Sequence, residues 1–191
     1  MQFVRLIARS LMACCLLACA ATFATAQDTA APAKPAVGTA VPPAQVYGKL
    51  MSGMEKEIVS AAEAMPEDKF DFAPAASMGE FKGVRTFAEQ VKHIAGSNYY
   101  FFADEETAKA KEAEIDKLKT KAEIIQALKD SYAFAHQSID AITAENVFVS
   151  TEHGTRGGMA AFCIAHMMDH YGQMVEYLRM NGIIPPASRG N

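Results

Sequence analysis

The sequence has no surplus of positive charge, few cysteines and only one long apolar run. Its 191 residues include 18 Lys and Arg against 22 Asp and Glu, which gives a net charge of −4 at pH 7. Proteins that bind nucleic acid electrostatically carry a basic patch or an excess of Lys and Arg. The acidic balance argues against that class, and a 50% hydrophobic content excludes a disordered chain. The length suits one domain with a core of its own.

The one apolar run is too short to span a membrane. It covers eleven residues from Leu11 to Ala21, whereas a spanning helix needs about 20. Two arginines precede it and small residues follow it, an order that predicts a signal peptide over residues 1–26 with cleavage before Gln27. We therefore expect a periplasmic or secreted protein. The alternatives are a membrane anchor and a lipoprotein modified at Cys19, which ends a lipobox-like run.

Cysteine becomes scarcer once the signal peptide is removed. Three of the four cysteines precede Gln27, so only Cys163 remains. The mature chain therefore has no internal disulfide, although an exported protein could form one. The signal peptide also carries two arginines and no acidic residue, which leaves the mature chain with a net charge of −6. Its stability must come from packing or from a metal ion.

No segment shows the period-two alternation of a β-strand. Residues 27–43 are mostly Ala, Pro and Thr, a composition that predicts a flexible linker without a core. From residue 44 onward the apolar residues recur with helical periodicity. The sequence therefore predicts an all-α domain over residues 44–191.

Two helices are predicted in the first half of this domain. One covers residues 44–65, ends before Pro66, and buries a stripe of apolar side chains: Val46, Leu50, Met54 and Ile58. The next begins at Thr86, where Thr86 and Glu89 have the spacing of a capping box, and extends to about Lys109.

Two further helices are predicted in the second half. The third begins with another capping box at Thr120 and buries four apolar residues: Ile125, Leu128, Tyr132 and Ile139. The fourth follows the turn-rich residues 154–158 and ends at Gly182, with Ile183 placed for a Schellman contact. Four amphipathic helices pack most simply as a four-helix bundle, and the long connection over residues 66–85 allows the chain to cross over.

Three histidines are the candidate site residues. His166 and His170 lie four residues apart, so both face one side of the fourth helix, a spacing that can hold a metal ion. His93 lies beside the apolar stripe of the second helix, on a stripe shared with Gln90 and Ser97. This placement suits a cleft at the margin of the bundle. An isolated HxxxH pair is also compatible with capping, surface or packing roles.

Other metal-site patterns do not fit. A zinc protease of the HExxH type needs Glu where the chain has Met167. The inverted HxxEH form would place Asp169 in the acidic position, but only 21 residues follow His170 to supply a further ligand. The paired Glu-x-x-His motifs of di-iron bundles are missing as well. Three histidines with an open coordination position remain.

Other residues of interest receive more ordinary interpretations. We expect His136 to be packed and hydrogen bonded, His153 to be solvated, and Cys163 to be a small buried apolar residue. Tyr100 shares the stripe of His93 and is a candidate pocket wall. The sequence leaves two alternatives for Arg156, contact with an anionic substrate or exposure to water.

Several motifs together resemble the DinB/YfiT-like superfamily. They are residues 86–95, the loop 154–156 and, most specifically, residues 166–173 followed by residues 177–186. The resemblance covers about Val46 to Arg189. It implies a four-helix bundle with a metal held by one histidine of the second helix and two of the fourth, here His93, His166 and His170. Characterised relatives include thiol-dependent transferases and isomerases, and many members have no assigned reaction.

The expectation is an exported DinB-like metal-binding protein that acts as a metal-dependent enzyme, by hydrolysis or thiol-dependent group transfer on a small molecule. Glu89 and Asp169 are the candidate catalytic residues, as partners of the histidines or as proton acceptors. The alternative is a non-catalytic periplasmic module that binds a metal or ligand. A third interpretation is that the histidines merely pack.

The expected cofactor is a divalent transition metal. Three imidazoles suit zinc first, with Ni, Fe(II) and Cu also compatible. The expected partner is a small-molecule substrate, with no nucleic acid and no transmembrane segment in the mature chain. A homodimer is left open by analogy with related bundles.

Overall fold

The computed structural model describes residues 34–190, and the predicted signal peptide and Cys19 lie outside this range. Residues 34–42 of the predicted linker are exposed and contain no helix. Within residues 43–190 the regular elements are all helices, joined by turns and loops, with one isolated bridge between Ser150 and Thr155. The predicted all-α class is therefore confirmed. None of the helices in this part of the chain combines the length and apolarity that crossing a bilayer requires.

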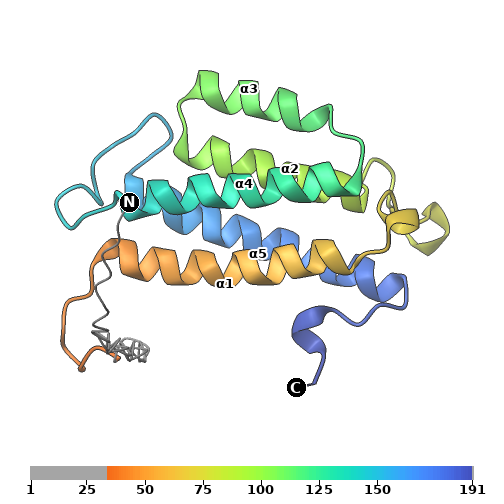
Figure 1. Ribbon diagram of the computed structural model, residues 1–191, viewed down its shortest axis with the longest axis horizontal. Helices are drawn as coiled ribbons and strands as arrows, with labels where there is room; N and C mark the ends of the chain where they lie inside the picture. Colours follow the sequence, from red (N-terminus) through yellow and green to blue (C-terminus); the bar gives the residue numbers. More distant parts are fainter. Residues whose placement is uncertain (1–33, 191) are drawn as a thin grey trace, which may run out of the picture. The chain divides into compact units, whose positions relative to one another are not determined.

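Four long helices form the bundle: α1 (Pro43–Ala64), α2 (Phe87–Phe102), α4 (Lys121–Asp140) and α5 (Arg156–Met180) (Figure 1). Helices α1 and α2 each pack against both α4 and α5, so α1 and α2 lie diagonally across the bundle. The connection between them holds two short 3₁₀ helices, η1 (Glu67–Lys69) and η2 (Ala76–Met78), and a third, η3 (Pro186–Ser188), follows α5. This arrangement matches the predicted crossover.

A fifth helix, α3 (Glu105–Asp116), was not predicted and lies on the outer side of α2 (Figure 1). The predicted second helix, which extended to Lys109, is wrong at its end because the backbone becomes extended at Ala103. Asp104 then caps α3 by accepting a hydrogen bond from the Thr107 backbone N–H at 2.8 Å. No Gly or Pro marks this break, so the helical periodicity predicted a single helix where the structure has two.

The predicted stripe of α1 is partly wrong. Ile58 is fully buried, but Val46 and Leu50 are 44% and 51% exposed. A spacing of four residues at each step drifts around a helix that has 3.6 residues per turn. The true buried face alternates steps of three and four and includes Met51, Ile58, Ala61 and Met65.

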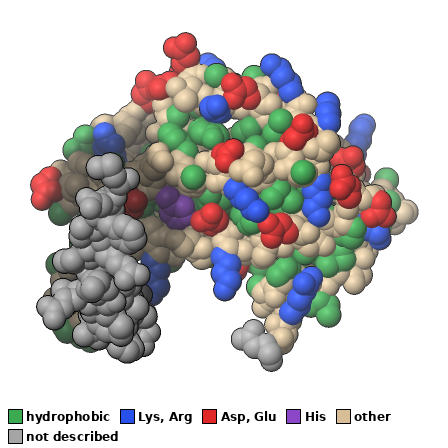
Figure 2. Space-filling view, viewed as in Figure 1, with side chains coloured by type: hydrophobic (Ala, Val, Ile, Leu, Met, Phe, Trp, Pro, Cys, Tyr) green, Lys and Arg blue, Asp and Glu red, His purple; other side chains and the backbone are tan. Residues whose placement is uncertain are grey.

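The other two helices show smaller deviations. Helix α4 buries Leu128, Tyr132 and Ile139 as predicted, and Ile124 takes the place expected for Ile125, which is only partly buried. Both predicted capping boxes are present, at Thr86 and Thr120. Figure 2 shows Lys and Arg side chains interspersed with Asp and Glu over the visible face of the helical domain.

The end of α5 is a Schellman motif, as predicted. Gly182 has φ +74°, its N–H donates to the Arg179 carbonyl, and the Ile183 N–H donates to the Leu178 carbonyl, both at 2.9 Å.

Two glycine-to-alanine changes, one inside α5 and one just after its end, should have opposite effects on stability. Gly182→Ala should lower the free energy of unfolding by about 1 kcal/mol, because a Cβ disfavours positive φ. Gly172→Ala, inside the helix with nothing within 4 Å of the added Cβ, should raise it by up to about 1 kcal/mol. Urea unfolding of both variants measures the difference. Equal effects would contradict the capping role of Gly182.

Candidate metal centre

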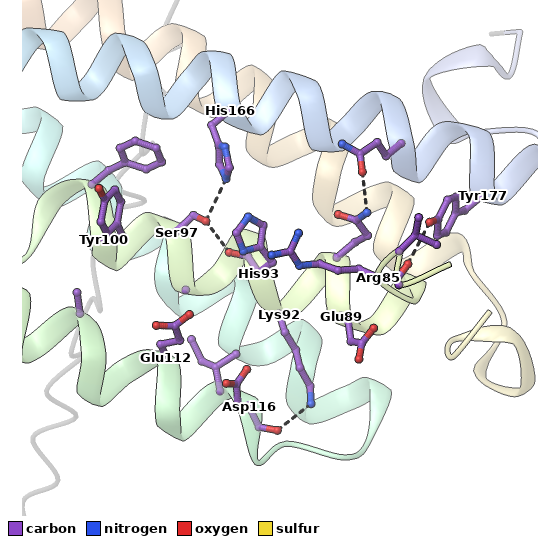
Figure 3. A pocket seen from close by; sticks show the side chains of 18 of the residues that line it. Arg85, Glu89, Lys92, His93, Ser97, Tyr100, Glu112, Asp116, His166 and Tyr177 are labelled. Atoms are coloured by element: carbon purple, nitrogen blue, oxygen red, sulfur yellow. Dashed lines mark hydrogen bonds between the residues drawn. The ribbon is translucent and has the colours of Figure 1, made fainter. Parts of the chain in front are cut away.

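The three predicted histidines meet between α2 and α5. His93 belongs to α2, His166 and His170 belong to α5, and one ring nitrogen of each lies within 4.8 Å of those of the other two. The ring centroids are 4.4 to 5.1 Å apart. In Figure 3, His166 on α5 and His93 on α2 point toward each other. Such a cluster can hold a metal ion, and its binding of one stays a prediction.

Burial keeps the three rings neutral. His170 is only 5% exposed, and the other two are partly buried. The pKa of His93 is lowered to about 4, first by burial and then by the charges of Arg85 and His166. The pKa of His170 also falls to about 4, through burial and then its two neighbouring histidines, and that of His166 falls mainly through burial. Neutral imidazole is the form that binds a metal.

The metal-free protein should lose stability as the pH falls from 6.5 toward 4. In that window unfolded histidines bind protons, while folded His93 and His170 stay neutral, so the free energy of unfolding decreases. We expect a loss of roughly 1–2 kcal/mol, because the partly buried His93 ring is screened in part by solvent. Urea unfolding of EDTA-treated protein at pH 7 and pH 5 measures this loss. The same loss in a His93→Gln/His170→Gln double variant would contradict the assignment.

A chain of hydrogen bonds runs from His170 to a carboxylate. Nδ1 of His170 lies 2.8 Å from Oε1 of Gln90, and Nε2 of Gln90 donates to Oε1 of Gln173 at 2.7 Å. Nε2 of Gln173 then donates to Oδ2 of Asp169 at 3.0 Å. We call these four residues the glutamine relay.

The carboxylate sets the direction of the glutamine relay. An ionised Asp169 can only accept, so Gln173 must present its NH₂ group to it and its carbonyl to Gln90. Gln90 in turn presents its carbonyl to His170, which must donate from Nδ1–H. This fixes the ring as the tautomer whose Nε2 carries a free lone pair. Metal-binding histidines are held in the same way by carboxylates or carbonyl groups.

Ser97 links the other two histidines. Its hydroxyl donates to the backbone carbonyl of His93 at 2.7 Å, one turn earlier on α2, and lies 3.1 Å from Nε2 of His166. Figure 3 shows both contacts. The His166 ring is therefore held by the helix that carries His93.

His93 and His166 line a cleft of about 1790 Å³ between α2, α3 and α5, which Arg85 also lines from the loop before α2. The buried His170 is not part of this lining. Helix α3, which the sequence interpretation missed, forms one wall. The predicted position at the margin of the bundle is therefore where the cluster lies. Tyr100 also lines the cleft, as expected.

The two candidate catalytic acids are already engaged. Glu89 lines the cleft, but its Oε2 accepts a hydrogen bond from the Thr86 N–H at 2.7 Å in the capping box. Asp169 is exposed and reaches His170 only through the glutamine relay. Neither carboxylate contacts a histidine of the cluster by a direct hydrogen bond among the described residues.

Most of the other candidate residues behave as expected. His136 bonds Glu55 at 2.8 Å. Cys163 is buried against Asn98, and burial raises the pKa of its thiol. Arg156 is exposed and does not line the cleft. The expectation for His153 is wrong, because its ring stacks on Tyr100 with centroids 4.9 Å apart and its Nε2 is buried.

Sequence reasoning missed Arg85 altogether and the roles of Gln90 and Gln173. The two glutamines share stripes with the histidines, which is a usable signal, but their hydrogen bonds depend on how α2 and α5 pack. Arg85 precedes a helix, where no periodicity indicates which way its side chain points.

Comparison with known proteins gives one informative match. The family model described as the DinB superfamily matches residues 51–174, about two thirds of the chain and a range that includes all three histidines. No curated protein matches the chain.

Proposed function

The chain belongs to the DinB superfamily, and from this premise we propose that it is an exported metal-dependent enzyme that acts on a small molecule by hydrolysis or thiol-dependent group transfer. The observation that carries the proposal is the cluster of His93, His166 and His170, in which His93 and His166 line an open cleft. Three neutral ligands leave room for a further ligand from the cleft side.

The donor chemistry supports a transition metal. All three donors are imidazoles with lowered pKa values, and the buried His170 has its Nδ1 occupied by Gln90. Zinc is our first choice, and Ni, Fe(II) and Cu are also compatible with imidazole ligands. When bound, such an ion lowers the pKa of a water or thiol at its open position.

The residues of the chain supply position and shielding. Gln90 and Ser97 hold His170 and His166 in orientation, while Phe101 packs edge-on against His166 with ring centroids 5.5 Å apart. Glu89 and Asp169 are the proton acceptors that we propose. Each must first leave its present partner, Thr86 or Gln173, to take a proton from a substrate.

The test loads the purified protein with zinc and screens it against hydrolase and thiol-transfer substrates. We expect turnover in the wild type and loss of it in His93→Ala, with metal content measured on both proteins. If the zinc-loaded protein turns over nothing and its metal has no exchangeable water, the enzymatic proposal is wrong.

A non-catalytic metal-binding module is the second candidate. It is favoured by one observation, the engagement of both Glu89 and Asp169 in hydrogen bonds away from the histidines. In that case the metal should bind tightly without an exchangeable water. Water-proton relaxation of the Mn²⁺- or Cu²⁺-loaded protein distinguishes the two candidates.

Export is tested separately. A mature protein isolated from its source should begin at Gln27 and be found in the periplasmic or secreted fraction. A chain that still carries residues 1–26, or one with a lipid at Cys19, would contradict the cleavage that we propose.

A further inference from the structure

The cleft holds a cation that no acidic side chain of the described residues neutralises. Arg85 lines the cleft, and its side chain takes part in no hydrogen bond or ion pair within residues 34–190. In Figure 3 its guanidinium extends from the loop before α2 across the cleft toward His93. Its charge contributes to the lowered pKa of all three histidines, which places it close to the cluster.

The acidic residue four positions after Arg85 does not pair with it. Glu89 lies one turn after Arg85, but it is held by the Thr86 N–H and points away from the histidines in Figure 3. Two of the other cleft cations are engaged, since Lys109 pairs with Glu105, and Lys92 donates to the Asp116 carbonyl at 3.1 Å. Lys119 also lines the cleft, but it follows α3 and is exposed. Arg85 is therefore the cleft cation that lies beside the histidines and is available to a ligand.

The opposite end of the cleft is aromatic and accessible. Tyr100 is 51% exposed and Phe162 is 60% exposed, and both line the cleft together with His153. Tyr100 follows His93 by seven residues, which separates them by about 10 Å along α2 on the same face. Exposed aromatic faces of this kind bind apolar or aromatic groups.

From this placement we infer that the ligand is an organic acid with an aromatic body. Its carboxylate pairs with Arg85 beside the histidine cluster, and its ring packs against Tyr100 and Phe162. A planar guanidinium binds a carboxylate through two parallel hydrogen bonds, and the neutral histidines add no negative charge to repel it. This inference deepens the proposed function, because it names the class of molecule on which the site would act.

The test measures binding of three probes to the full mature chain by calorimetry, with and without zinc. The probes are 3-phenylpropionate, its neutral amide, and propionate, which lacks the ring. We expect the aromatic acid to bind at least about 10-fold more tightly than either of the others, as a charged hydrogen bond and a buried ring predict.

Arg85→Gln should remove the preference for the acid and leave binding of the amide unchanged. Lys82→Gln, a matched change at an exposed cation of the same loop that does not line the cleft, should keep it. Tyr100→Ala should reduce only the preference for 3-phenylpropionate over propionate. Equal binding of acid and amide by the wild type, no binding of 3-phenylpropionate at all, or an unchanged preference in Arg85→Gln would overturn the inference.

The two proposals fail separately in this experiment. Zinc binding without any preference for the acid would leave the metal site intact and refute the ligand class. An Arg85-dependent preference in a protein that never binds zinc would support the ligand class and refute the metal-dependent function.

Discussion

The His170→Ala protein should bind zinc on the order of 100- to 1000-fold more weakly than the wild type. Zinc held by four protein ligands contributes roughly 10–16 kcal/mol of binding free energy, so one imidazole accounts for about 2.5–4 kcal/mol. His170 is the most buried of the three and the one held by the glutamine relay. Competition against a chromophoric chelator, together with elemental analysis of the purified protein, measures the loss.

His136→Ala is the matched control. This histidine belongs to α4, where it pairs with Glu55 of α1, outside the cluster. Its loss should leave the zinc affinity unchanged. Because His93 contributes from the other helix, His93→Ala should reproduce the loss seen for His170→Ala. Unchanged zinc affinity in both cluster variants, with native helical content by circular dichroism, would show that the three rings pack without binding metal.

The features that the sequence predicted are those set by local rules. A spacing of four residues places His166 and His170 on one face of any helix, and the capping boxes at Thr86 and Thr120 act within one turn. Gly182 ends α5 through its own backbone conformation. Spacing along the chain does not predict that His93 approaches His166 and His170. That part of the prediction came from the resemblance to the superfamily.

The features that the sequence did not predict depend on packing between helices. The break at Ala103 leaves α3 free to lie against α2, and this position creates the cleft wall. The buried face of α1 is the face that contacts α4 and α5. The apolar character of Val46 did not show where these contacts would be, and Val46 is exposed. Arg85 lies in the connection before α2, where no helical periodicity predicts the direction of a side chain. Local rules therefore placed His166 and His170 on one face of α5 but did not predict the cleft beside the cluster.

Replacing Gln90 by methionine should weaken zinc binding about 10- to 100-fold, although Gln90 is not itself a candidate ligand. Methionine is similar in length but cannot accept a hydrogen bond from Nδ1–H of His170, which would then lose its partner in a buried site. The ring would also no longer be fixed in one tautomer and orientation. Losing such a partner of a metal-binding histidine typically costs this much affinity.

Gln90→Glu separates orientation from simple packing. Glutamate fills nearly the same volume and still accepts from Nδ1 of His170, although it can no longer donate to Oε1 of Gln173. We therefore expect near wild-type zinc affinity in Gln90→Glu and the full loss in Gln90→Met. Gln137→Met, at an exposed position of α4, should change nothing. If Gln90→Glu and Gln90→Met weaken zinc equally, the glutamine relay does not orient His170, and Gln90 serves only to fill the space between α2 and α5.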